Sequence, residues 1–179
     1  MQSPEGRGRE SVRAGDGINE DVWCRLREMI GTANRGDADA HFLAIRNWPR
    51  EVPAATQQRI GVYLLYLLYR KVKAILGRTP AAGDLHELAL SSYPRFREML
   101  HADEAQLEET LRKAFEFPPL QAPLQPGEFV VFSSVVLGVL LVNPNEELEG
   151  MRPGLAAWLH RNQEQFRAEG LLDDDAAGR

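Results

Sequence analysis

Five residues between positions 59 and 73 carry side chains suited to binding an acidic or anionic partner. Arg59, Tyr63, Tyr66, Arg70 and Lys73 follow one another at spacings of four, three, four and three residues. Because a helix turns by about 100° per residue, this spacing places all five on one stripe. Tyrosine and arginine are enriched at interface hot spots. We call this set the tyrosine stripe and predict that it is a binding surface.

The charge around the tyrosine stripe differs from that of the whole chain. The 179 residues have a formal net charge of −5, yet no Asp or Glu lies between Glu51 and Asp84, where five Lys and Arg residues occur. This local positive charge favours a partner with an acidic surface. A homodimer through the tyrosine stripe or through the face of Ser134 and Gly138 is the alternative partner. The net charge argues against nucleic acid as the partner. Under the alternative interpretation, the rings pack under neighbouring loops and the cations are merely solvated.

Residue types that catalyse reactions or bind metals are present, but their spacing does not match a known site. The segment His86–Leu90 (HELAL) has leucine where the zinc-protease motif needs its second histidine. Asp37 and His41 share a helical face, but Asp39 points elsewhere. Cys24 is expected to be a buried, inert thiol. We therefore expect no cofactor, no metal site and no catalytic residue, and we favour a non-enzymatic protein.

One short segment resembles a known family. Residues 76–90, LGRTPAAGDLHELAL, are similar to the lead-in and first helix of bacterial helix-turn-helix segments. The resemblance covers fifteen residues and implies a DNA-binding regulator as an alternative function. Ser91-Ser92-Tyr93-Pro94 stands where that family has a glycine turn followed by a recognition helix.

Hydrophobic periodicity predicts about seven helices that would position these residues. Capping residues, glycines and prolines set their limits. We expect Pro94 to end or bend the fourth helix and Pro153-Gly154 to split the seventh. On the fifth helix, Glu108 and Glu109 precede Arg112 and Lys113 by four residues, which predicts a solvated face of ion pairs. The predicted helices cover residues 19–34, 37–47, 53–76, from 80, from 103, 127–142 and from 143.

Two of these helices should form the core. In residues 59–76 the side opposite the tyrosine stripe is aliphatic, so it must face inward. Residues 129–142 are a run of fourteen mostly apolar residues, which suits a buried helix better than a strand. Ser134 and Gly138, four residues apart, would let another helix approach closely. In the helix that contains residues 59–76, the side chains expected to face inward are Ile60, Leu64, Leu67, Leu68, Val72 and Ile75.

The fold class predicted from these patterns is all-α, a compact helical bundle. We expect a single domain over residues 18–170, with possible sub-bundles 18–116 and 127–170 joined by a proline-rich connector, and disordered tails at 1–17 and 171–179. No apolar run reaches the roughly 20 residues of a membrane span. One cysteine and no leader-like segment favour a cytoplasmic protein, and the Arg-, Ala- and Gly-rich composition indicates a bacterial-like coding bias.

The sequence therefore predicts a helical binding module that contacts another protein through the tyrosine stripe. On that hypothesis, alanine at Tyr66 and Arg70 should abolish partner binding and leave stability nearly unchanged. The second hypothesis is a binding domain or enzyme for an anionic small molecule. Its pocket would lie between the tyrosine stripe and the proline-rich connector.

Overall fold

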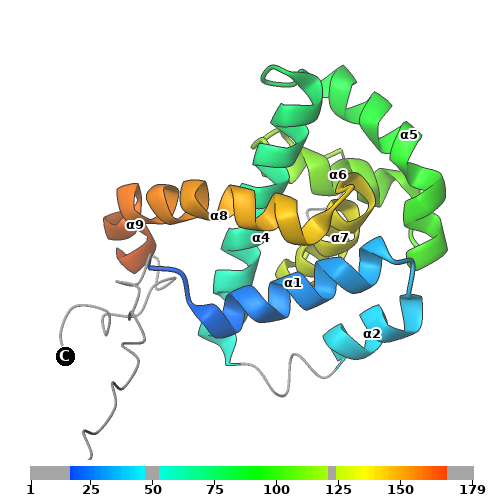
Figure 1. The fold of residues 1–179 in the computed structure, drawn as a ribbon. Coiled ribbons are helices and arrows are strands. Elements are labelled where there is room, and N and C mark those ends of the chain that lie inside the picture. The colour runs from blue at the N-terminus through cyan, green and yellow to red at the C-terminus, as the bar shows by residue number, and fades with distance from the viewer. Residues whose placement is uncertain (1–16, 47–52, 121–123, 169–179) are drawn as a thin grey trace, which may run out of the picture.

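The computed structural model describes residues 17–46, 53–120 and 124–168, and this part of the chain forms eight helices and no strand (Figure 1). The all-α fold is confirmed. The tails expected at 1–17 and 171–179 lie outside the described residues, apart from Gly17. The helices are α1 (Glu20–Asn34), α2 (Ala38–Arg46), α4 (Ala54–Leu76), α5 (Ala82–Met99), α6 (Glu104–Ala114), α7 (Pro126–Leu140), α8 (Pro144–Arg161) and α9 (Gln163–Ala168).

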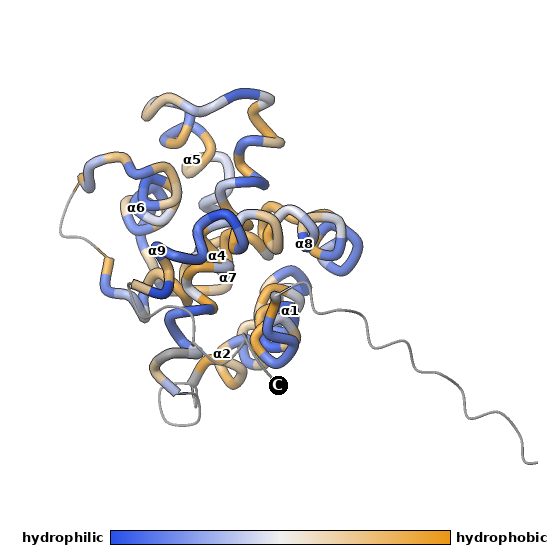
Figure 2. The backbone as a smooth tube through the Cα atoms, turned by 90° about the vertical axis from the view of Figure 1, so that its left-hand side faces the viewer, coloured by the Kyte–Doolittle hydropathy of each residue, from blue (hydrophilic) through white to orange (hydrophobic). Residues whose placement is uncertain are grey.

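Helix α7 is the centre of the bundle. It packs against α1, α4, α5 and α6, and most of its side chains from Phe129 to Val139 are buried. Figure 2 shows α7 as hydrophobic along most of its length, with hydrophilic stretches of other helices around it. Because each buried aliphatic side chain contributes about 1.5–3 kcal/mol, this segment specifies the core. The predicted helix is confirmed, although it ends at Leu140 and not at Val142.

Helices α1 and α7 approach each other closely at Gly138. A Cβ at this position would lie 2.6 Å from the Cβ of Ala33 and 2.8 Å from the backbone nitrogen of Asn34. The side-chain amide of Asn34 also donates hydrogen bonds to the carbonyls of Gly138 (2.9 Å) and Leu141 (2.7 Å), which satisfies the end of α7. The predicted close approach of another helix is therefore confirmed, and that helix is α1.

Local capping residues set several helix limits where the sequence predicts them. Asp103 accepts a hydrogen bond from the Gln106 backbone nitrogen (2.9 Å), and the Gln106 side chain accepts one from Asp103 (3.0 Å), so α6 opens with a capping box. Asn19 caps α1 by accepting from Val22 (3.1 Å). Gly77 ends α4 with a φ of 68°, a conformation that glycine adopts without strain.

The predicted split of the seventh helix at Pro153-Gly154 is wrong. Helix α8 continues through both residues to Arg161, and the break before α9 falls at Asn162. Pro153 and Glu149 are both exposed, so water can satisfy the Glu149 carbonyl that loses its partner. Gly154 instead lets Tyr66 approach α8 closely, because a Cβ there would collide with the hydroxyl of Tyr66.

Helix α5 runs unbroken from Ala82 to Met99, with Pro94 inside it. The turn and second helix that the helix-turn-helix resemblance implies are therefore absent from these residues. Among the described helices, none is long and apolar enough to cross a membrane alone. Helices α7 and α8 reach the required length only as a pair, which is bent by 116°.

Candidate functional site

The two tyrosines of the tyrosine stripe do not face outward as predicted. Tyr63 is 1% exposed and Tyr66 is 8% exposed. The Tyr66 ring packs 5.2 Å from the ring of Trp158 on α8, and Trp158 in turn lies 5.1 Å from Phe166 on α9. Helices α1, α8 and α9 thus cover a face that the sequence alone could assign to solvent. The aliphatic side points inward as expected, except that Ile75 is exposed.

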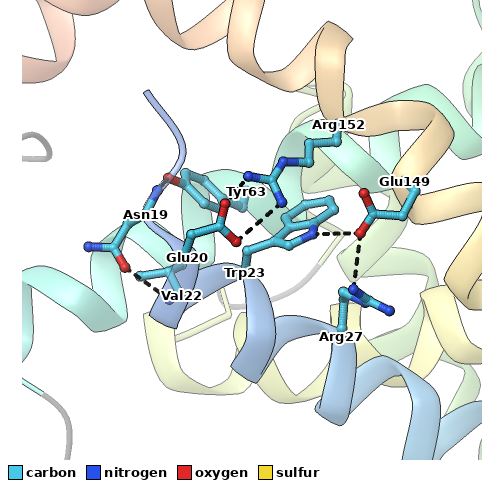
Figure 3. Close-up of polar contacts among 8 residues, drawn as sticks. All are labelled: Asn19, Glu20, Val22, Trp23, Arg27, Tyr63, Glu149 and Arg152. Carbon is cyan, nitrogen blue, oxygen red and sulfur yellow. Dashed lines mark hydrogen bonds and ion pairs between the residues drawn. The ribbon is translucent and has the colours of Figure 1, made fainter. Parts of the chain in front are cut away.

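Polar contacts between α1 and α8 lie beside Tyr63 (Figure 3). The Tyr63 hydroxyl accepts a hydrogen bond from the Asn19 backbone nitrogen (3.2 Å). The indole of Trp23 donates to Glu149 (3.1 Å), while the Arg152 guanidinium lies 5.5 Å from the Trp23 ring centre. Because these contacts join α1 to α8, they keep both helices packed over the buried tyrosines of the tyrosine stripe.

The cations near the tyrosine stripe are partly compensated within the chain. Lys71 forms an ion pair with Glu147 of α8, and Arg78 forms one with Asp84 (2.6 Å). Lys73 lies over the Tyr69 ring, 5.6 Å from its centre. Arg70 is exposed and Arg59 is half-buried. The acidic partner that the charge pattern predicts is thus supplied in part by α8.

The acidic residues of α6 are not the solvated face that the sequence predicts, because Glu108 and Glu109 are both buried. Glu108 accepts a hydrogen bond from His86 (2.8 Å) and pairs with Arg112 (3.4 Å). The hydrogen bond to Glu108 raises the pKa of His86, an effect that desolvation only partly opposes. Glu109 accepts a hydrogen bond from the Leu120 backbone nitrogen. Both carboxylates therefore have structural partners.

His41 is buried where α2 meets α1 and α7. Its Nδ1 lies 3.0 Å from the Met29 carbonyl and 3.2 Å from the Thr32 hydroxyl, and its Nε2 lies 3.5 Å from the Ser134 hydroxyl. Desolvation lowers the pKa of His41, although the hydrogen bond to Met29 partly offsets the effect. A neutral imidazole that donates from Nδ1 to the carbonyl satisfies this environment.

Cys24 is exposed, which contradicts the predicted buried thiol. Together with Arg27 and Arg35 it lines an open hollow of about 520 Å³ between α1 and the start of α8. Among the described residues, no three His, Cys, Asp or Glu side chains are grouped so that they could hold a metal ion.

A cleft of about 800 Å³ lies between α4 and α7. Its walls come from residues 54–65 of α4 and residues 126–132 of α7, with Ile45 of α2 and Lys113 of α6 completing the lining. The lining is mainly apolar, and its polar side chains are two glutamines, Lys113 and Glu128. This volume and composition are typical of small-molecule sites, which range over about 300–1,000 Å³.

Lys113 is the only basic side chain among the described residues that line the cleft. Its ammonium lies 4.7 Å from the centre of the Phe129 ring, and no described carboxylate is within ion-pair distance of it. Although the side chain is largely exposed, desolvation lowers the pKa of Lys113. The expected pairing of Lys113 with Glu109 is therefore replaced by a cation–π contact at the cleft.

The sequence contains one weak signal for this cleft. Gly61 and Gly138 are both glycines inside strongly apolar helices. The space beside Gly138 is filled by α1. A Cβ at Gly61, in contrast, would meet only Val130, at 3.8 Å. A glycine of this kind indicates missing volume, but only the packing of the other helices decides whether the space is filled.

Comparisons with protein-family models, with curated proteins and with solved structures found no match to this chain.

Proposed function

We propose that this protein is a non-enzymatic binding module whose cleft between α4 and α7 takes an elongated apolar small molecule. The observation that carries the proposal is the cleft itself, with a volume of about 800 Å³ and a mainly apolar lining. Its position next to the proline-rich connector agrees with the second sequence hypothesis, but its lining lacks the tyrosine hydroxyls of that hypothesis.

The composition of the lining favours binding over catalysis. Among the described residues that line the cleft there is no Ser, Cys or His, and hence no Ser–His or Cys–His pair that would activate a nucleophile. Apolar walls release ordered water when they contact an apolar ligand, and each Å² removed from water contributes about 25 cal/mol. The cleft can therefore supply affinity with little polar chemistry.

Protein binding through the tyrosine stripe has less support, because its two tyrosines are buried. Arg70 and Lys73 on the outer part of α4 remain candidates for contact with an acidic partner, and this stays a prediction.

The proposed function can be tested with the uncharged fluorescent probe N-phenyl-1-naphthylamine, which brightens in apolar surroundings. We expect the wild-type chain to bind it and Gly61→Leu to weaken binding about tenfold or more, since the new side chain would occupy the cleft. Gly150→Leu is the matched control, because Gly150 is also a helical glycine and a Cβ at this position would meet no atom within 4 Å.

Thermal melting of both variants shows whether they are folded. If Gly61→Leu does not fold, the binding test uses Val131→Phe, which fills the cleft from the α7 wall. Failure of the wild-type chain to bind the probe, or undiminished binding by a folded cleft-filling variant, would overturn the proposed function.

A further inference from the structure

We propose that the natural ligand of the cleft is a single-chain amphiphile with one negative charge on its headgroup, and that Lys113 binds this headgroup. This inference rests on the proposed function and adds the chemical class of the ligand. It follows from the shape of the cleft, the position of Lys113 and the distribution of charge along its walls.

The cleft is elongated along α4. Its lining on this helix runs from Ala54 to Leu65, a distance of about 16 Å at 1.5 Å per residue. The opposite wall is formed by consecutive residues of α7, and a Cβ at Gly61 would approach Val130 on that wall. Two facing walls that are mostly apolar suit a ligand with one extended hydrocarbon chain.

Lys113 enters the lining from α6, and its ammonium lies over the ring of Phe129 on the α7 wall. Because the Lys113 side chain is exposed, its charge lies at the rim of the cleft, in contact with water. An ammonium at the rim of an apolar space binds a polar headgroup and not the hydrocarbon chain.

The charges of the lining favour a ligand with no more than one negative charge. Lys113 contributes one positive charge to the lining, and Glu128 contributes one negative charge. One oxygen of Glu128 accepts a hydrogen bond from the Gln125 backbone nitrogen (2.9 Å), so this carboxylate already caps α7. Lys113 has no such anionic partner among the described residues. One ammonium neutralises a monoanion, whereas a dianion would leave a charge uncompensated near Glu128.

The test compares cis-parinaric acid, a fluorescent long-chain carboxylate, with its uncharged methyl ester. We expect the wild-type chain to bind the acid about tenfold more tightly than the ester, since a charge-assisted contact is made only with the acid. Lys113→Met should abolish this preference and leave ester affinity within about twofold, because methionine retains an apolar stem. Lys113→Arg should restore it.

The matched control is Lys73→Met, which removes another ammonium that lies over an aromatic ring but does not line the cleft. It should leave the preference for the acid unchanged. Glu128→Gln should increase affinity for the acid and not for the ester. Dodecanoate should also compete for the cleft better than dodecyl phosphate, whose headgroup carries a second charge at pH 8.

Equal affinity of the wild-type chain for acid and ester would overturn the inference. A preference that survives Lys113→Met, or tighter binding of the phosphate, would do so as well. If the wild-type chain still binds the ester in these cases, and Gly61→Leu blocks that binding, the proposed function stands. If the wild-type chain binds neither the acid nor the ester, the proposed function itself is refuted.

Discussion

Gly138 on α7 packs directly against Ala33 on α1, so closely that a Cβ at Gly138 would lie 2.6 Å from the Cβ of Ala33. The backbone of α1 is equally near, which leaves no flexible atom that could move aside. This contact joins the central helix to the first helix of the chain.

We predict that Gly138→Ala destabilises the protein by about 1–3 kcal/mol, because the methyl group forces α1 and α7 apart. In an unconstrained helix the same change would stabilise by about 1 kcal/mol. Gly150→Ala on α8 measures that baseline, since a Cβ at Gly150 would have no atom within 4 Å. Urea unfolding of both variants gives the comparison, and equal gains in stability would show that α1 and α7 are not in tight contact.

A second prediction concerns the tyrosine stripe. Tyr66→Ala should cost about 3–5 kcal/mol of folding free energy, because it removes a buried ring packed against Trp158. Arg70→Ala should change stability by no more than about 0.5 kcal/mol, since Arg70 is exposed. Denaturation of the two single variants separates these effects. A Tyr66→Ala variant as stable as wild type would contradict the burial of this ring and revive the surface hypothesis.

The third prediction concerns acid sensitivity at His41. Desolvation holds the pKa of His41 below its usual value of 6.5 in the folded chain, so the unfolded chain binds more protons as pH falls. Stability should therefore be fully present above about pH 6.5 and decline as pH falls toward the folded-state pKa. Urea midpoints measured from about pH 7.5 to pH 5 should show this decline, and His41→Gln should flatten it. An unchanged slope in a folded His41→Gln variant would assign the acid sensitivity to other groups.

His86 should contribute a pH dependence of the opposite sign. The hydrogen bond to Glu108 raises the pKa of His86 above 6.5, so the stability it provides is complete below pH 6.5. That stability is lost as pH rises through the folded-state pKa. NMR titration of the His86 ring should show the raised pKa, and Glu108→Gln should return it toward 6.5. The same pKa in both proteins would mean that the contact with Glu108 does not persist in solution.

The helices themselves follow from local sequence signals. Asp103 and Gln106 cap each other within one turn, and Gly77 adopts its positive φ without help from distant residues. The helical state of α7 follows from the length of its apolar run. Each of these features depends on neighbours in the sequence, so each can be predicted from the sequence alone.

The orientation of surfaces depends on distant residues and was harder to predict. The wheel of α4 separates tyrosines from leucines, but only the packing of α8 and α9 shows that Tyr66 meets Trp158. The ion-pair spacing on α6 likewise does not reveal that Glu108 has His86 as a partner. The cleft is the extreme case, because it is space that no side chain fills, and no residue type encodes that directly.

The late position of α7 in the chain has a consequence for biosynthesis. Helices α1, α4, α5 and α6 pack their apolar sides against α7, although α7 begins only at Pro126. On the ribosome, these earlier helices emerge before the segment on which they pack. Nascent chains must therefore keep those apolar sides shielded, by chaperones or by transient collapse, until α7 leaves the exit tunnel and folding can be completed.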